Sequence, residues 1–457
     1  MKKSEQKGNT LNKIVAMTLI NPFSAGIDIS DKEHVIAVAE GLADERVRAF
    51  GTMTCDLEAI SNWLSACQIE TVAMESTGVY WKPLFSHLIS KGFEVYLVNA
   101  AHVKNVAGRK DDENDAMWLQ KLHSCGLLRS SYLPDEDQEK LRTIVRFRRT
   151  MLEDSSRFIN RIQKSLELMN IKFHTIIRDI TGMSGMAVLK AILDGERNPA
   201  NFLPLLDYRI KADKEIIIKS LEGKWQEEHL FTLRQSYEMY SHYRKQIAEC
   251  DAEIEKHLQR IEAKINQGEL SDKTEKLPSK ERKMKYKNSP QISNVRQYLA
   301  KIHGVDVLSI YGLSDSGGLD LLAETGTDLS KWDNENKFIG WLNLCPDNKI
   351  SAGKVLSSKV KKLKSNAASK AFKYAANSVQ RSDNWLGDYF RRMKTKGGNK
   401  YAIVATANKI ARIYYKMVTQ KVPFIPVEIT VYQQQRQQKQ IAYLERKLER
   451  LRANAAA

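Results

Sequence analysis

The chain of 457 residues carries 72 Lys and Arg against 55 Asp and Glu, a formal net charge of +17 with a sequence pI near 9.4. This charge predicts a polyanionic partner, nucleic acid before an acidic membrane surface, and the length allows about three domains. No apolar run is long enough to span a bilayer, so we expect no membrane partner. The cysteines argue for a reducing cytoplasm and against zinc, because they are scattered and never form a CxxC pair. They are Cys55, Cys67, Cys125, Cys250 and Cys345.

After a basic N-terminal arm of residues 1–22, the chain alternates short apolar strands with helical segments. The predicted strands are a pair on either side of a turn near Asp31, a third at residues 71–75 and a fourth at residues 93–98. The segments 57–67 and 81–91 have helical character. This alternation is typical of an α/β sheet.

Acidic residues occupy unusual places in this region. Asp28 lies inside the first strand, where strand propensity disfavours Asp, and Glu75 ends a strand, where open α/β sheets bind ligands. Asp112 and Asp115 are three residues apart at the start of a helical pattern, so their carboxylates share one face. Each of these positions alone has an ordinary explanation. Two Asp residues in a first helical turn interact favourably with the helix dipole, and a single Asp or Glu near a strand is often a turn or cap residue. Together they favour a site for one or two Mg²⁺ ions, about 4 Å apart in two-metal phosphodiester chemistry.

Residues 138–266 have a helical pattern throughout, with apolar residues at steps of three and four that predict an antiparallel helical arm or coiled coil. Arg148, Arg149, Arg157 and Arg161 lie within the first half of this arm. Their density favours contact with nucleic-acid phosphates, although a solvated charged face is the ordinary alternative.

A linker or insertion at residues 267–292 precedes a mainly helical region, residues 293–425, and a tail, residues 426–457, that reads as a free helix. Ser351 is a candidate nucleophile because it lies in a loop between Pro346 and Gly353, ahead of lysines that could hold a phosphate. A serine needs an activator, and the sequence shows none nearby. The ordinary alternative is that Ser351 caps a turn. On spacing alone, Ser357 and Ser358 are equally good candidates for the nucleophile. The lysines that follow include Lys354, Lys359, Lys361 and Lys362.

Four motifs resemble the DEDD-type insertion-sequence transposases of the IS-one-ten family, which are related to the pilin-inverting recombinases and are also called bridge recombinases. They are Gly26–Asp28, Met74–Tyr80, Gly108–Leu119 and Leu344–Lys354. The order Asp, Glu, Asp, Asp matches that family's acidic motif, and the likeness extends over residues 23–422.

This resemblance implies a RuvC-like, RNase H-fold domain at residues 23–137 and a serine-bearing transposase domain at residues 293–425. It implies that Asp28, Glu75, Asp112 and Asp115 hold Mg²⁺ and that Ser351 becomes joined to a DNA 5′-phosphate. It further implies a noncoding bridge RNA that pairs with donor and target DNA. Dimers would pair into a tetramer, with the acids of one subunit facing the serine of another.

We therefore predict an RNA-guided, Mg²⁺-dependent serine recombinase of an insertion sequence in a prokaryotic cytoplasm. We expect its nucleic-acid contacts to include Arg109 and Lys110 besides the arginines and lysines named above. One alternative is a RuvC-like Holliday-junction nuclease that uses water, for which Ser351 would be dispensable. The other is a non-catalytic nucleic-acid-binding scaffold.

Overall fold

The computed structural model describes residues 19–76, 78–99, 115–131, 133–267, 287–352, 354–359 and 366–456. The chain divides into two compact units, Met1–Leu133 (unit 1) and Pro134–Ala457 (unit 2). The finer division into six segments stays a prediction. Of the helices in the described residues, none is long and apolar enough to cross a membrane.

Unit 1 is built on a five-stranded mixed sheet in the order β3-β2-β1-β4-β5. Strands β1, β4 and β5 run parallel, whereas β2 and β3 continue the sheet antiparallel from β1. This order confirms the predicted α/β, RuvC-like class, and only β3 was missed, because its four residues are half-exposed and carry no apolar run. The strands are β1 (Ser24–Ile29), β2 (His34–Val38), β3 (Val47–Phe50), β4 (Thr71–Glu75) and β5 (Glu94–Val98).

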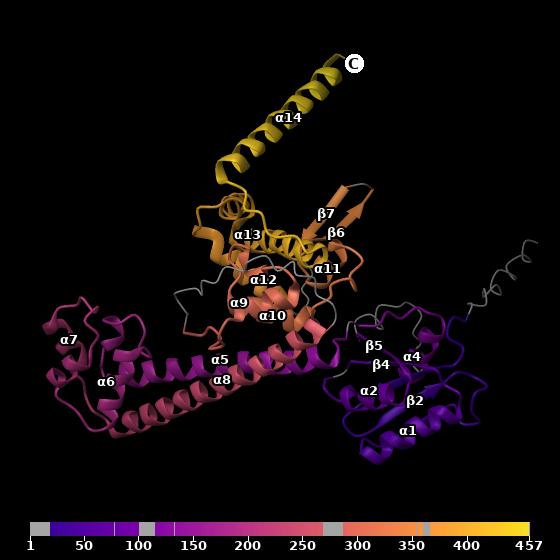
Figure 1. Cartoon of the computed structure of the whole chain (residues 1–457), viewed down its shortest axis with the longest axis horizontal. Coiled ribbons are helices and arrows are strands. Elements are labelled where there is room, and N and C mark those ends of the chain that lie inside the picture. The colour runs from indigo at the N-terminus through magenta and orange to yellow at the C-terminus, as the bar shows by residue number, and fades with distance from the viewer. Residues whose placement is uncertain are drawn as a thin grey trace, which may run out of the picture. The chain divides into compact units, whose positions relative to one another are not determined.

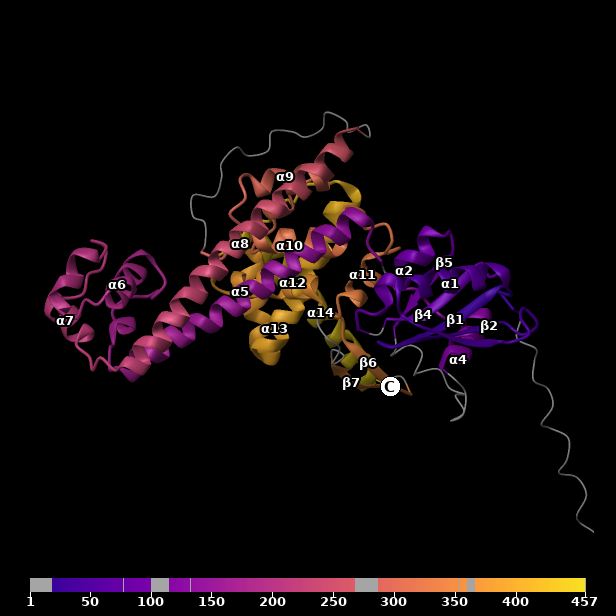
Figure 2. The same cartoon turned by 90° about the horizontal axis from the view of Figure 1, so that it is seen from below.

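Helices cover both faces of this sheet (Figures 1 and 2). Because side chains alternate along a strand, Ala25, Ile27 and Ile29 enter the core that the sheet forms with α1 and α2. The opposite face, with Ala73 and Val98, packs on α4. The helices are α1 (Thr54–Ala66), α2 (Trp81–Ser90) and α4 (Asp115–Ser124).

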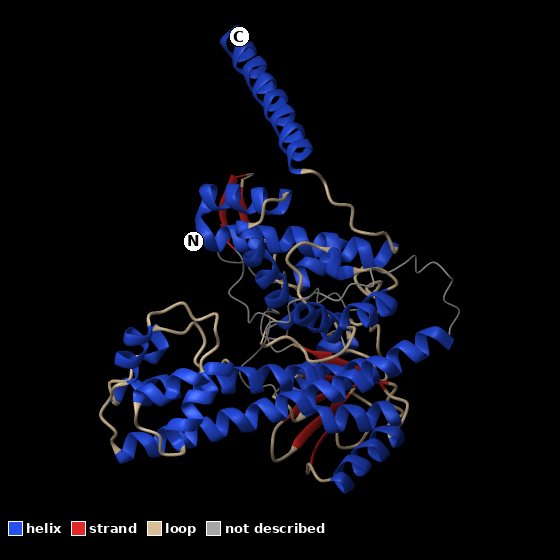
Figure 3. Ribbon diagram, turned by 60° about the vertical axis from the view of Figure 1, so that its left-hand side comes forward, coloured by secondary structure: helices blue, strands red, loops and turns tan. Residues whose placement is uncertain are grey.

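Unit 2 begins with the predicted helical arm, formed by α5 (Glu136–Leu168) and α8 (Glu227–Gln267). The two helices lie side by side over their length (Figures 1 and 3). They run antiparallel, because the start of α5 packs in one core with the end of α8, and the end of α5 packs in another with the start of α8. The second core closes the arm with α6 (Met183–Leu193), α7 (Lys214–Leu221) and two short 3-10 helices, Phe173–Thr175 and Pro199–Leu205.

The rest of unit 2 is mainly helical, as predicted, around a core that contains Phe338, Phe372 and Tyr414. It differs from expectation at the serine motif, which forms a hairpin of two strands where we expected a loop. Strands and helices are α9 (Val295–His303), α10 (Asp315–Thr325), α11 (Glu335–Trp341), β6 (Asp347–Ser351), β7 (Lys354–Lys359), α12 (Ala367–Ser378), α13 (Trp385–Gln420) and α14 (Ile429–Ala456), with 3-10 turns at Val307–Ser309 and Val379–Arg381.

Candidate active site

Strand pairing brings Asp28 and Glu75 together at one end of the unit 1 sheet. β1 and β4 are paired in parallel from Ser24 opposite Thr71 to Ile27 opposite Met74. The same register, carried one residue further, sets Asp28 beside Glu75. Neighbours in a parallel pair point to the same face, and these two lie at the carboxyl ends of their strands. Both side chains are partly exposed.

Helix α4 crosses that same face in very close contact with β1. Gly26 makes the contact possible, since a Cβ atom at this position would lie 2.3 Å from the carbonyl oxygen of Ala116 and 2.3 Å from the backbone nitrogen of Gln120. Glycine inside a strand marks such an approach of another backbone. Gly26 therefore indicates a close backbone approach to β1, although a glycine alone does not identify α4 as the approaching element.

The direction of α4 carries Asp115 toward the other two acids. At its C-terminal part, His123 Nε2 lies 2.5 Å from Thr71 Oγ1, at the start of β4. One turn earlier, Gln120 Nε2 donates a hydrogen bond of 3.3 Å to Ser24 Oγ, at the start of β1. The helix therefore runs antiparallel to the strands, and its first residue, the exposed Asp115, lies toward the strand ends that carry Asp28 and Glu75.

His123 is a positioning residue that the sequence did not reveal. Its side chain is buried, its ring centroid lies 4.7 Å from that of Tyr96, and burial lowers its pKa to about 4. The imidazole is therefore neutral at pH 7, and its hydrogen bond with Thr71 joins α4 to β4 without burying a charge.

The acids offer hard carboxylate oxygens, the ligands that Mg²⁺ prefers. Among the described residues, no group of three or more His, Cys, Asp or Glu side chains is arranged to hold a metal ion. Asp112, the fourth acid of the predicted set, lies outside the described residues, as do Arg109 and Lys110. The donor chemistry and the shared end of the sheet fit a divalent cation.

Ser351 ends β6 in unit 2, where it pairs with Lys354 of β7 across a two-residue turn. Both residues are exposed. Ala352 has a φ of 46°, in the left-handed region that costs a residue with a side chain about 1–2 kcal/mol. Backbone strain of this kind is often found at functional sites, and here it falls next to the predicted nucleophile. Lys359 ends β7, whereas Lys361 and Lys362 lie outside the described residues.

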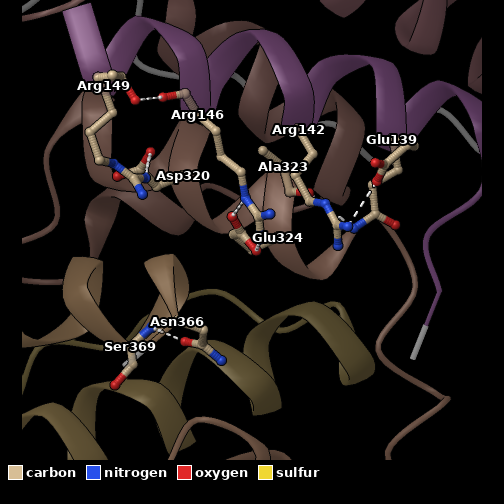
Figure 4. Close-up of polar contacts among 11 residues, drawn as sticks. Glu139, Arg142, Arg146, Arg149, Asp320, Ala323, Glu324, Asn366 and Ser369 are labelled. Carbon is tan, nitrogen blue, oxygen red and sulfur yellow. Dashed lines mark hydrogen bonds and ion pairs between the residues drawn. The ribbon is translucent and has the colours of Figure 1, made fainter. Parts of the chain in front are cut away.

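The predicted arginines divide into two kinds. Arg148 is buried, and its Nε donates a hydrogen bond of 2.5 Å to Asp251 on α8. Arg149 pairs with Asp320 on α10 (Figure 4). Burial raises the pKa of Asp320 above its usual value, and the charge of Arg149 offsets part of this rise. These two residues hold α5 against its neighbours in unit 2 through ion pairs with buried or partly buried acids.

The other two arginines are exposed. Arg157 lies 3.0 Å from Asp154 on its own helix and remains 72% exposed, and the Arg161 guanidinium lies 4.7 Å from the centre of the Phe158 ring. Arg146, on the same helix, forms a two-pronged ion pair of 2.7 and 2.8 Å with the buried Glu324 of α10 (Figure 4).

Two family models match the chain. Residues 25–171 match the DEDD model of IS110 transposases, described as a transposase, and residues 306–391 match a model described as transposase of the IS116/IS110/IS902 family. The two segments together cover about half of the chain, and they contain the strand-end acids, Asp115 and Ser351. No curated protein matches the chain.

Proposed function

The chain belongs to the IS110 family of transposases, and from that premise we propose that it is an RNA-guided DNA recombinase that uses Ser351 as its nucleophile. Family membership makes it an insertion-sequence enzyme that cuts and rejoins DNA, and DEDD transposases generally use a divalent metal. Beyond family membership, we propose that a guide RNA selects the DNA, that Ser351 is the nucleophile, that the metal is Mg²⁺ and that the active assembly is a tetramer. We place the reaction in a prokaryotic cytoplasm.

The arrangement of Asp28, Glu75 and Asp115 carries this proposal. Three acids from two strands and a helix lie on one face and toward one end of a sheet, the end at which open α/β sheets bind ligands. With Asp112 they would hold one or two Mg²⁺ ions. Bound there, Mg²⁺ would supply Lewis-acid stabilisation to the oxygens of a phosphodiester under attack.

In the proposed reaction, Ser351 Oγ attacks the phosphorus of a DNA phosphodiester, and the bond from phosphorus to the 3′ oxygen breaks. The serine proton passes to a base of the acidic site and from it to the leaving 3′ oxygen. The products are a 5′-phosphate joined to Ser351 and a free 3′-hydroxyl. Attack of another strand's 3′-hydroxyl on this phosphoserine releases the serine and completes the exchange, so no cofactor is consumed.

The acids and the serine belong to separate compact units, and Ser351 is exposed at a hairpin end. Both features support a composite site in which the acids of one subunit activate the serine of another. In this arrangement the bridge RNA would select donor and target by base pairing, while the protein binds backbone. Lys354 is exposed beside Ser351 and would hold the phosphate near the hydroxyl.

The test is covalent trapping of the protein with its cognate RNA, labelled donor and target DNA and Mg²⁺. We expect a denaturation-resistant protein–DNA adduct that is lost in Ser351→Ala and in Asp115→Asn. Ser357→Ala, which removes a hydroxyl from the same hairpin, should retain the adduct. Cleavage that persists in Ser351→Ala without an adduct would mean that water is the nucleophile. An adduct of equal yield without RNA would refute RNA guidance.

A mixing experiment tests the composite site. Ser351→Ala and Asp28→Asn proteins should each be inactive alone, because each lacks one half of the site. Mixed before RNA and DNA are added, they should form the adduct on the Asp28→Asn chain only, since that chain alone has the serine. A mixture that stays inactive, from subunits shown to assemble, would place the acids and the serine in the same chain.

A further inference from the structure

Helix α13 contains a built interruption. Gly397 and Gly398 have non-helical backbone angles, and Gly398 has a φ of 80°, in the left-handed region that favours glycine. A Cβ atom at Gly397 would lie 2.8 Å from the ring of Tyr401, so the glycine makes room for this ring. The contact between Gly397 and Tyr401 and the left-handed conformation of Gly398 together stabilise the break in the helix.

Three lysines surround the interruption without a counter-charge. Lys394, Lys396 and Lys400 are exposed, and in the described part of the chain they form no hydrogen bond or ion pair. The sequence from Tyr389 to Val427 contains nine Lys and Arg and no Asp or Glu. Like charges this close repel one another, and a polyanion that binds them relieves the repulsion.

Three arginines of α13 already have partners within unit 2, whereas Lys394, Lys396 and Lys400 are available to a ligand. Arg392 donates a hydrogen bond of 3.2 Å to Tyr432, and Arg412 pairs with Glu335. Arg391 donates to the carbonyl of Ser382 at 3.0 Å.

Two lysines on other helices show the paired alternative, in which an acid three or four residues away offsets the charge. Lys140 lies 2.5 Å from Glu136, and Lys256 lies 2.9 Å from Glu253. These pairs are the ordinary form of a solvated charged helix face. Lys394, Lys396 and Lys400 have no such pairs, so their charge is not offset within the helix.

We propose that Lys394, Lys396 and Lys400 form a docking surface for the phosphate backbone of duplex DNA, which we call the α13 lysine surface. Lysine binds phosphate as a point charge and reads no base, so the surface fits backbone contact. The nearby Tyr401 packs against Gly397 and is 45% exposed, so the surface offers one aromatic ring, whereas single strands are usually bound by several rings on which successive bases stack. A duplex with stacked bases therefore suits the surface better than a single strand.

This inference rests on the proposed function only in taking DNA as the substrate. The α13 lysine surface would hold the duplex outside the chemical site, whatever its sequence. Its loss should weaken binding of cognate and unrelated DNA alike, in contrast to the loss of Ser351, which should leave binding intact.

The experiment measures binding of the full chain to an unrelated duplex DNA by fluorescence anisotropy, without Mg²⁺, at several salt concentrations. Lys394→Gln/Lys396→Gln/Lys400→Gln should lower the slope of log K against log salt by about 2.7, since each phosphate contact contributes about 0.9. Between 50 and 200 mM salt, the unmodified chain should then lose about 40-fold more affinity than this variant. Because no cleavage is measured, the result is independent of the adduct assay.

Two controls separate a surface from net charge and from misfolding. Lys211→Gln/Lys214→Gln/Lys219→Gln removes equal charge from exposed residues at the end of the arm and should leave the slope unchanged. Lys394→Arg/Lys396→Arg/Lys400→Arg keeps the charge and should keep the slope. Equal slope changes in the two Gln variants would overturn the proposal. So would a slope change seen with structured RNA and absent with duplex DNA.

Discussion

Substituting Gly26 by Ala should displace α4 and the candidate site with it. The added Cβ would meet backbone atoms of Ala116 and Gln120 at 2.3 Å, about 1 Å inside ordinary contact, and backbone cannot rotate away. Helix α4 must then move by about 1 Å, or the sheet must bend, and overpacking of this kind costs roughly 1–3 kcal/mol. Because Asp115 opens α4, its carboxylate moves away from Asp28 and Glu75. A misplacement of about 1 Å in an active site costs roughly 100-fold in rate.

Hydrogen exchange of the full chain measures the structural part of this prediction. A loss of about 1 to 3 kcal/mol should speed exchange of the α4 amides by roughly 5- to 150-fold, while the α8 amides in unit 2 stay protected. Adduct yield in the trapping assay should fall in parallel. Gly340→Ala is the control, because no atom lies within 4 Å of a Cβ there. Unchanged α4 exchange in Gly26→Ala would refute the close contact between α4 and β1.

Two further predictions concern buried groups. The pKa of His123 falls from 6.5 to about 4 on folding, so between these values only the unfolded chain takes up the proton. Unit 1 should therefore lose up to about 3 kcal/mol of stability as the pH falls from 6.5 to 4, and a His123→Gln variant that loses as much in denaturant titrations would contradict this. Arg148→Met should destabilise unit 2 by about 3–5 kcal/mol in urea, because it leaves the Asp251 carboxylate buried without its partner. Arg148→Met/Asp251→Leu should recover much of that loss, and a double variant no more stable than the single would count against the pair.

Local sequence patterns were sufficient for most elements of unit 1 and for the arm. Short apolar runs bounded by turns located β1, β2, β4 and β5, and steps of three and four located α5 and α8, because burial selects apolar residues at these positions. The serine hairpin was missed for the same reason. Its strands expose Ile350 and Leu356 at 61% and 71%, so no buried face imposes a period on β6 and β7.

The candidate site was predictable as a set of residues, and its arrangement was not. Asp28 and Glu75 were singled out because acids are out of character in apolar strands, and the sheet order then made them neighbours. The role of Gly26 depended on the path of α4, which begins 89 positions later in the chain at Asp115. No local pattern encodes a contact at that separation.

The sequence by itself determined the net positive charge, which predicts a polyanionic partner, and it located the acids at the strand ends and the helical arm. Only the tertiary structure decided which charges are available to a ligand. Arg148 and Arg149 carry the same side chain as Arg157, yet the first two are paired with Asp251 and Asp320, which lie 103 and 171 positions away. The free energy of a charged side chain depends on its burial and its partner, and both are set by packing between distant segments. Lys394, Lys396 and Lys400 were likewise distinguished from paired lysines only when their neighbours were known.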